Sequence, residues 1–154
     1  MVKATPHLPE IDVRSLDGAR LVIPRDLGGV RNILAIAFHR TQQSSVDTWT
    51  PEFARLEHAD PSLVSYEIPV ISRRWGPLRP LIDGGMTAAI PDPKTRAHTL
   101  TSYTDVGRVI RALGLEDTDR IAVAVADREG RIHWLHRGDR TDRAADSLRA
   151  ALDL

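Results

Sequence analysis

The chain has no cysteine among its 154 residues. The thiolate is the nucleophile in disulfide exchange and in thiol-based peroxide reduction, so this protein performs neither reaction. The same absence excludes disulfide frameworks, zinc–thiolate sites and iron–sulfur clusters. A chain of this length buries a sufficient core without such cross-links, and we expect one domain over residues 1–154.

Long apolar runs and net charge are missing as well. No run approaches the ~20 apolar residues of a membrane-spanning helix. Twenty-one basic residues balance twenty-one acidic ones, so no overall field attracts nucleic acid or anionic lipid, and we expect no nucleic-acid partner. Residues 1–9 lack the apolar stretch of a secretory signal and are expected to form a loose lead-in. A cytoplasmic protein is therefore expected.

The apolar pattern predicts alternating strands and helices. Residues 10–24 read as a hairpin with a turn at Asp17-Gly18. The near-continuous apolar strand 32–38 is expected to be covered on both faces. The other expected elements are a strand over 63–71, a loop over 73–77, a helix over 78–90, a loop over 91–93, a strand over 97–103, a helix over 105–113, a hairpin of strands 121–126 and 131–136, and a final helix capped by Thr141-Asp142. This order is typical of an α/β sandwich, with helices over a mixed sheet.

The helix after strand 32–38 has two start signals. Ser44-Ser45-Val46-Asp47 has the form of a capping box, and Thr50-Pro51-Glu52 has an N-cap followed by proline at the first helical position. One helix uses both signals if it begins near Ser44 and kinks at Pro51. In the next strand, Pro69 predicts a bulge or an edge position.

Two segments resemble the thioredoxin superfamily, in particular its peroxiredoxin-like and bacterial thiol-reductase-like branch. Residues 38–46 lie over the Phe-x-x-x-x-Cys-x-x-Cys motif of that superfamily without a gap, with Gln43 and Val46 at the two cysteine positions. Residues 127–132 are similar to its Asp-x-x-Gly-x-Ile hairpin. The resemblance implies a thioredoxin-like sandwich, a mixed central sheet flanked by helices, preceded here by an N-terminal β-hairpin.

A closer resemblance, over about residues 30–152, is to the thioredoxin-like family of mitochondrial ATP synthase assembly factors and its bacterial relatives. In eukaryotes that family helps a membrane subunit of the rotary ATP synthase to assemble and needs no redox chemistry. The resemblance therefore implies a binding or chaperone role. It rests on Phe38-x-Arg40-x-x-Gln43, Val46-Asp47-x-Trp49, Tyr66-Glu67-Ile68-Pro69-Val70-Ile71 and Gly130-Arg131-Ile132-x-Trp134.

The loop between the strand 32–38 and the following helix is the first candidate site. Free N–H groups at a helix N-terminus favour an anion or a carbonyl, and loops at this end of α/β strands gather function. In the alternative interpretation Ser44 only caps the helix, Arg40 is solvated and nothing binds. The candidate binding residues are His39, Arg40, Gln42, Gln43, Ser44 and Ser45.

A basic and aromatic cluster is the second candidate site. Arg73, Arg74 and Arg79 surround Trp75, which suits a phosphate, an acidic partner helix or single-stranded nucleic acid. The alternative is a solvated loop with Trp75 folded onto the core. We prefer that alternative, because one short cluster in a neutral protein is weak evidence of binding.

The sequence contains no residue pattern that indicates a metal site or a hydrolase triad. The six histidines show no metal-ligand spacing, and His133 and His136 are expected on opposite faces of one strand. Ser44 and Ser45 have His39 nearby but no nucleophile elbow, so a hydrolase triad is not expected. We expect no metal, no cofactor and no catalytic residue.

The preferred hypothesis is a non-redox binding or assembly factor whose loop 39–45 and segment 73–79 face an unidentified protein partner. The alternative is an enzyme or small-ligand binder that uses the helix N-terminus at Ser44 and Ser45 together with Arg40. A third is self-association as a homodimer through the same loop. A concave pocket beside Ser44 and Arg40 would favour the enzyme, whereas exposed apolar side chains near Trp75 would favour the binding protein.

Overall fold

The computed structural model describes residues 6–154, and its seven strands form one mixed sheet in the order β2-β1-β5-β4-β3-β6-β7. β4 is parallel to β3 and β5, and the other neighbouring pairs are antiparallel. The predicted mixed sheet and N-terminal hairpin are confirmed. The strands are β1 (Ile11–Ser15), β2 (Arg20–Ile23), β3 (Arg31–Ala37), β4 (Leu63–Ser72), β5 (Leu100–Thr104), β6 (Ala122–Ala126) and β7 (Ile132–Arg137).

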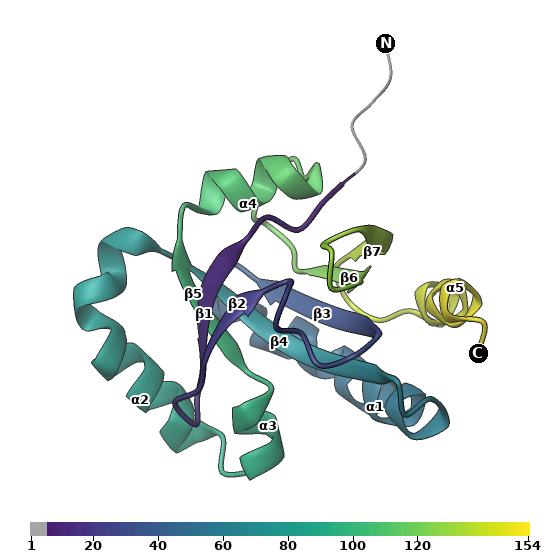
Figure 1. Cartoon of the computed structure of the whole chain (residues 1–154), viewed down its shortest axis with the longest axis horizontal. Coiled ribbons are helices and arrows are strands. Elements are labelled where there is room, and N and C mark those ends of the chain that lie inside the picture. The colour runs from purple at the N-terminus through teal and green to yellow at the C-terminus, as the bar shows by residue number, and fades with distance from the viewer. Residues whose placement is uncertain (1–5) are drawn as a thin grey trace.

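Helices cover both faces of this sheet. Figure 1 shows α1 and α5 together at one side of the molecule, α4 at another, and α2 far from α5. Within residues 6–154, no helix has both the length and the apolar character needed to cross a membrane. The helices are η1 (Arg40–Gln42), α1 (Gln43–Ala59), η2 (Arg73–Leu78), α2 (Arg79–Ala89), α3 (Pro93–Ala97), α4 (Val106–Leu113) and α5 (Asp142–Leu152), where η marks a 3₁₀ helix.

The central strand β3 separates two apolar cores. Leu34 and Ile36 belong to the core that includes α4, and Ile33 and Ala35 belong to the core that α1 and α5 cover. All four side chains are buried. The expected cover on both faces of this strand is therefore confirmed.

The expectation of one helix that begins near Ser44 and contains Pro51 is confirmed, since α1 begins at Gln43 and Pro51 lies inside it. A turn of 3₁₀ helix precedes α1, and Ser44 therefore does not cap it.

β4 is an inner strand, and Pro69 is neither at an edge nor at a bulge. It stands at the last pair with β3, opposite Ala37. On the other side of β4, Glu67 already bridges Thr99, and the pairing resumes at Val70 with Ser102. Pro69 lies in the gap between these two pairs, where its missing N–H leaves the ladder interrupted.

The expected loose lead-in is wrong for residues 7 and 8, and residues 1–5 lie outside the described part of the chain. The backbone N–H of Leu8 donates to the carbonyl of Gly130 over 2.8 Å, and the Leu8 side chain is buried. Gly130 has a φ of +89°, and a Cβ there would lie 2.6 Å from the His7 ring. A side chain at position 130 would displace this segment.

The expected loop over 73–77 is wrong, because this segment forms most of η2. The expected loop over 91–93 is confirmed for Pro91 and Asp92, whereas Pro93 is the first residue of α3. Asp92 caps α3 by accepting from the N–H of Thr95. Proline at the first helical position loses no helical hydrogen bond, because the first N–H groups of a helix have no partner within it.

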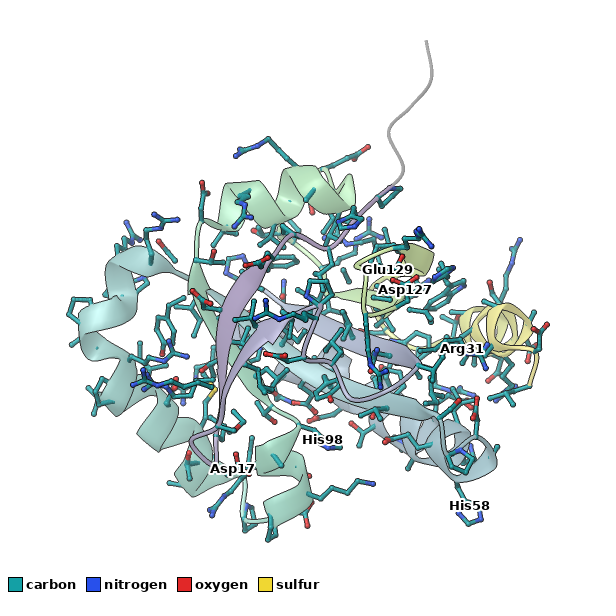
Figure 2. All side chains as sticks on the ribbon, in the orientation of Figure 1. Asp17, Arg31, His58, His98, Asp127 and Glu129 are labelled. Carbon is teal, nitrogen blue, oxygen red and sulfur yellow. The ribbon has the colours of Figure 1, made fainter. Side chains whose placement is uncertain are left out.

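Arg31, at the start of β3, forms hydrogen bonds with the C-terminal ends of α1 and α5. Its guanidinium donates to the carbonyl of Leu152 in α5 and to the Asp60 carboxylate at the end of α1, both over 2.9 Å. Figure 2 shows Arg31 between the sheet and α5. This residue therefore helps to hold α1 and α5 side by side on the sheet.

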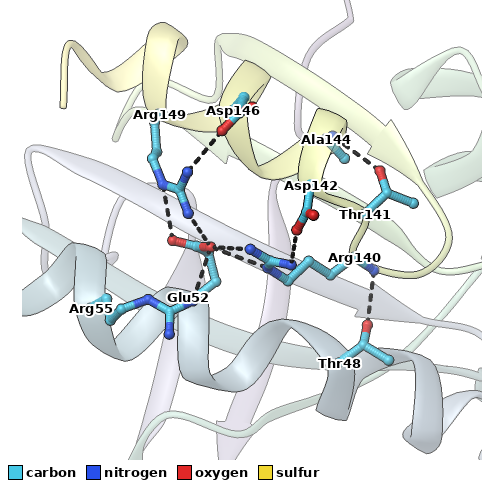
Figure 3. Close-up of polar contacts among 9 residues, drawn as sticks. All are labelled: Thr48, Glu52, Arg55, Arg140, Thr141, Asp142, Ala144, Asp146 and Arg149. Atoms are coloured by element: carbon cyan, nitrogen blue, oxygen red, sulfur yellow. Dashed lines mark hydrogen bonds and ion pairs between the residues drawn. The ribbon is translucent and has the colours of Figure 1, made fainter.

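A buried carboxylate holds α5 to α1 more extensively. Glu52 in α1 is 1% exposed and accepts hydrogen bonds from Arg140, from Arg149 in α5 and from Arg55, as Figure 3 shows. Burial raises the pKa of Glu52, but the three guanidinium groups lower it by more, so the pKa lies below its ordinary value of 4.5. The charged cluster therefore stabilises the folded state above that pH.

We expect Glu52→Gln to lower the free energy of unfolding by about 2–4 kcal/mol at pH 7, because it removes the charge that three arginines share. The difference from the wild type should shrink as the pH falls from 4.5 through the lowered pKa, since the wild-type carboxylate then becomes protonated. Urea unfolding at a series of pH values measures both effects.

The matched control is Asp146→Asn, which removes an exposed partner of Arg149 and should cost no more than about 0.5 kcal/mol. A Glu52→Gln loss as small as that of the control, or one that does not depend on pH, would contradict the role given to this cluster.

Candidate functional site

Gln42 holds the candidate loop in place and is not free to bind a ligand. Its side-chain oxygen accepts from the N–H of Phe38 over 2.8 Å, and its side-chain nitrogen donates to the carbonyl of Thr118 over 2.7 Å. The residue is 8% exposed. His39 lies beside it, with Nε2 2.9 Å from the Thr118 hydroxyl. These contacts join the loop before α1 to the segment before β6.

The other loop residues differ in accessibility. The Ser45 hydroxyl donates to the Asp139 carboxylate in the segment between β7 and α5. Arg40 and Ser44 are exposed, and their side chains make no hydrogen bond with any of residues 6–154. Of the six candidates in this loop, Arg40 and Ser44 are therefore the most available for a partner.

Gln43, which the sequence resemblance aligns with the first thioredoxin cysteine, lies close to two carboxylates, those of Asp47 and Glu67. Its side-chain nitrogen donates to Asp47 over 3.0 Å. Burial raises the pKa of Glu67 on β4; a hydrogen bond from Gln43 opposes this rise, and the charge of Asp47 adds to it. The sequence analysis did not select Glu67, although a charged residue in the middle of an apolar strand was a visible signal.

A groove of about 690 Å³ lies between this loop and the segments before β6 and after β7. Its donors are mostly engaged within the protein. Arg137 donates to the carbonyls of Ile121, Asp117 and Arg120. Arg40 and Ser44 do not line the groove. The lining residues that the sequence analysis did not select include Asp119, Arg120, His136, Arg137 and Asp139.

Arg79 does not share a surface with the other arginines of the second cluster. Its guanidinium donates to Asp83 and to Thr101 of β5 and lies 4.5 Å from the ring centroid of Tyr103. Asp83 also accepts from the hydroxyls of Thr101 and Tyr103, over 3.0 and 2.8 Å. We call these four residues the clasp. It fixes α2 to the sheet through polar contacts.

Within the clasp, the protonated phenol of Tyr103 and the opposite charges of Arg79 and Asp83 complement one another. Burial raises the pKa of Tyr103, and its hydrogen bond to the Asp83 carboxylate raises it further, so the phenol remains a donor. The Arg79 charge balances that of Asp83. α2 has no fully buried residue, so polar contacts contribute much of its attachment: the clasp joins it to β5, and Arg96 donates to the carbonyls of Thr87 and Ile90.

Trp75 does not fold onto the core, contrary to the preferred expectation. It is 42% exposed, and the Arg74 guanidinium lies 5.1 Å from its ring centroid. Leu78 and Leu81 follow at intervals of three residues and are 45% and 74% exposed. Residues three apart lie on one side of a 3₁₀ or an α-helix. We call Trp75, Leu78 and Leu81 the apolar stripe.

A hollow of about 520 Å³ lies next to the stripe, at the carboxyl ends of β4 and β5. Residues 72–74 and 104–107 line it. Within the described chain, neither Arg73 nor Arg74 forms an ion pair. The hollow thus carries two free guanidinium groups against one carboxylate, that of Asp105, which caps α4.

The remaining tryptophans and histidines have structural contacts. Trp49 is fully buried and donates to the carbonyl of Gly138, whereas Trp134 is partly buried and donates to Ser147. Trp134 packs against the core that α1 and α5 cover. The ring of His136 stacks on Trp134. Among residues 6–154, no three His, Asp or Glu side chains are grouped as metal ligands.

Comparison with protein-family models finds no match, and neither does comparison with curated protein sequences. Solved structures do match. A thiol:disulfide interchange protein from Bacteroides sp. is 14% identical with a TM-score of 0.65, over 99% of this chain and 92% of that one. A putative electron transfer protein from Aquifex aeolicus is 14% identical with a TM-score of 0.67, over 97% and 98%.

A pneumococcal exposed lipoprotein thioredoxin from Streptococcus pneumoniae is 13% identical with a TM-score of 0.61, over 95% of this chain and all of that one. At these identities the likeness shows the fold alone. The chain has a thioredoxin-like fold, and it has no cysteine with which to perform thiol chemistry.

Proposed function

We propose that this protein is a non-redox binding protein, working as an assembly or chaperone factor, and that it contacts its protein partner through the apolar stripe. The specific role in ATP synthase assembly and the cytoplasmic setting stay predictions from the sequence. Binding through the exposed Arg40 and Ser44 is a further prediction, since both belong to the loop that carried the thiols in the thioredoxin superfamily.

The orientation of η2 and α2 is the observation that carries this proposal. The charged pair Arg79 and Asp83 faces the sheet through the clasp, while Trp75, Leu78 and Leu81 face solvent. The half-buried residues of α2 also include Ile82 and Met86, so its sheet side is of mixed polarity. Its outer side nevertheless carries a large apolar side chain, where a surface helix normally has polar residues. Three large exposed apolar side chains in a row are typical of an interaction surface.

The groove beside loop 39–45 supports the alternative less well. It is concave, as a ligand site should be. However, the Ser45 hydroxyl is bonded to Asp139, His39 contacts Thr118, and Gln42 is held by backbone groups. A ligand would have to displace these internal bonds, and leaving any of the buried groups unpaired would cost about 1–3 kcal/mol each.

We expect Leu81→Asp to lower the affinity for the protein partner by about thirtyfold, because a charge within an apolar contact is desolvated without a counter-charge. The partner is first identified by affinity capture from the native host with mass spectrometry. Its affinity for each purified variant is then measured by calorimetry.

The matched control is Val30→Asp, which changes an exposed apolar residue between β2 and β3 and should leave binding unchanged. Arg40→Ala tests the loop separately. If capture yields no partner, or if Leu81→Asp and Val30→Asp bind alike while Arg40→Ala has no effect, the proposed function is wrong.

The clasp should also determine the local stability of α2, which carries part of the apolar stripe. We expect Asp83→Asn to speed hydrogen exchange of the α2 amides by about tenfold or more, because it removes the charge that Arg79 balances and a strong acceptor for Tyr103. Amides of α5 are the internal control and should not change. Exchange measured by mass spectrometry tests this, and unaltered α2 protection would show that other contacts hold the helix.

A further inference from the structure

The apolar stripe and the hollow form one continuous surface. Arg74 belongs to both, since it lines the hollow and lies 5.1 Å from the ring centroid of Trp75. Two cations and a set of hydroxyl groups, those of Ser72 and Thr104, thus lie at one end of three exposed apolar side chains. A partner that covers the stripe brings its own side chains to the hollow.

We propose that the partner segment is an amphipathic helix whose apolar face ends in one or two acidic side chains, and that these carboxylates enter the hollow between η2 and α4. This inference rests on the proposed function and names the chemistry of its partner. Arg73 and Arg74 are the groups that select the acid.

The shape of the stripe favours a helix as the occupant. Its three side chains span seven residues of helical backbone, which is about 10 Å. Such a row is a ridge of the kind that packs into the groove between ridges of another helix, and two turns of that helix cover its length. Trp75 and Leu81 would be the anchors.

The charges favour an acidic flank. Within the part of the chain that the structure describes, Arg73 and Arg74 have no ion-pair partner. The one carboxylate in the hollow, that of Asp105, is already bonded to the N–H of Arg108. Arginine binds carboxylates in two-pronged geometry, and a lysine from the partner would face two like charges. The end of the stripe next to the hollow therefore favours an acidic side chain of the partner over a basic one.

The test uses two synthetic helical peptides with the same leucine stripe, one with glutamates and the other with lysines at the end that faces the hollow. We expect the glutamate peptide to bind about tenfold more tightly at low ionic strength, with the difference narrowing as salt is added. Anisotropy of a labelled peptide measures both affinities on the full chain.

The double variant Arg73→Glu/Arg74→Glu should reverse the preference between the peptides. The matched control, Arg25→Glu/Arg143→Glu, makes the same charge change at exposed arginines that line neither the groove nor the hollow, and it should keep the preference for glutamate. Equal affinity for the two peptides, or no reversal, overturns the inference.

Two other occupants give different outcomes. Arginine-dependent binding to phosphatidylserine vesicles without a preference for the glutamate peptide would assign the surface to a membrane. A concentration-dependent dimer that Leu81→Asp abolishes would assign it to a second copy of this chain. Either overturns the inference. If the partner captured from the host is lost with Leu81→Asp but kept with the double arginine variant, the proposed function stands and this inference alone fails.

Discussion

The carboxylate of Glu52 is the interaction on which the arrangement of α1, α5 and the groove depends. It lies in the contact between the two helices and binds Arg140 and Arg149, which come from the C-terminal quarter of the chain. Arg140 in turn donates its backbone N–H to Thr48. The segment between β7 and α5 is thereby held against α1, which brings Asp139 to Ser45. One buried charge thus sets the wall of the groove.

A thioredoxin-like loop without sulfur needs other contacts to keep its shape, and Gln42 supplies them. Its amide contacts backbone groups on both sides of the groove, at Phe38 and at Thr118. The hydrogen-bonding groups of the loop are therefore mostly paired within the protein, and few donors are free to bind a ligand. Among the described residues, the large exposed apolar side chains include the three of the apolar stripe. The proposed partner contact therefore lies at the stripe rather than in this loop.

The local features of the fold could be predicted from the sequence because they depend on neighbouring residues. Examples are the turn at Asp17-Gly18, the cap at Thr141 and the apolar strand 32–38, each of which depends on residues close together in the sequence. The contact of Ser45 with Asp139 joins residues 94 positions apart, and no pattern in the sequence predicts it. The inner position of Pro69 depends in the same way on which strands flank β4.

The second candidate site shows why a helical pattern alone does not give the direction in which a helix faces. Arg79 and Asp83 are four residues apart, a spacing that usually marks a solvated face. Here each finds a partner in Thr101 or Tyr103, so the pair can face the sheet without an unsatisfied charge. Arg79 and Asp83 are turned inward beside the half-buried Ile82 and Met86, and Leu81 lies on the exposed side of α2. The clasp therefore helps to fix the orientation of α2, and substitutions that weaken the clasp should also loosen the surface that carries the stripe.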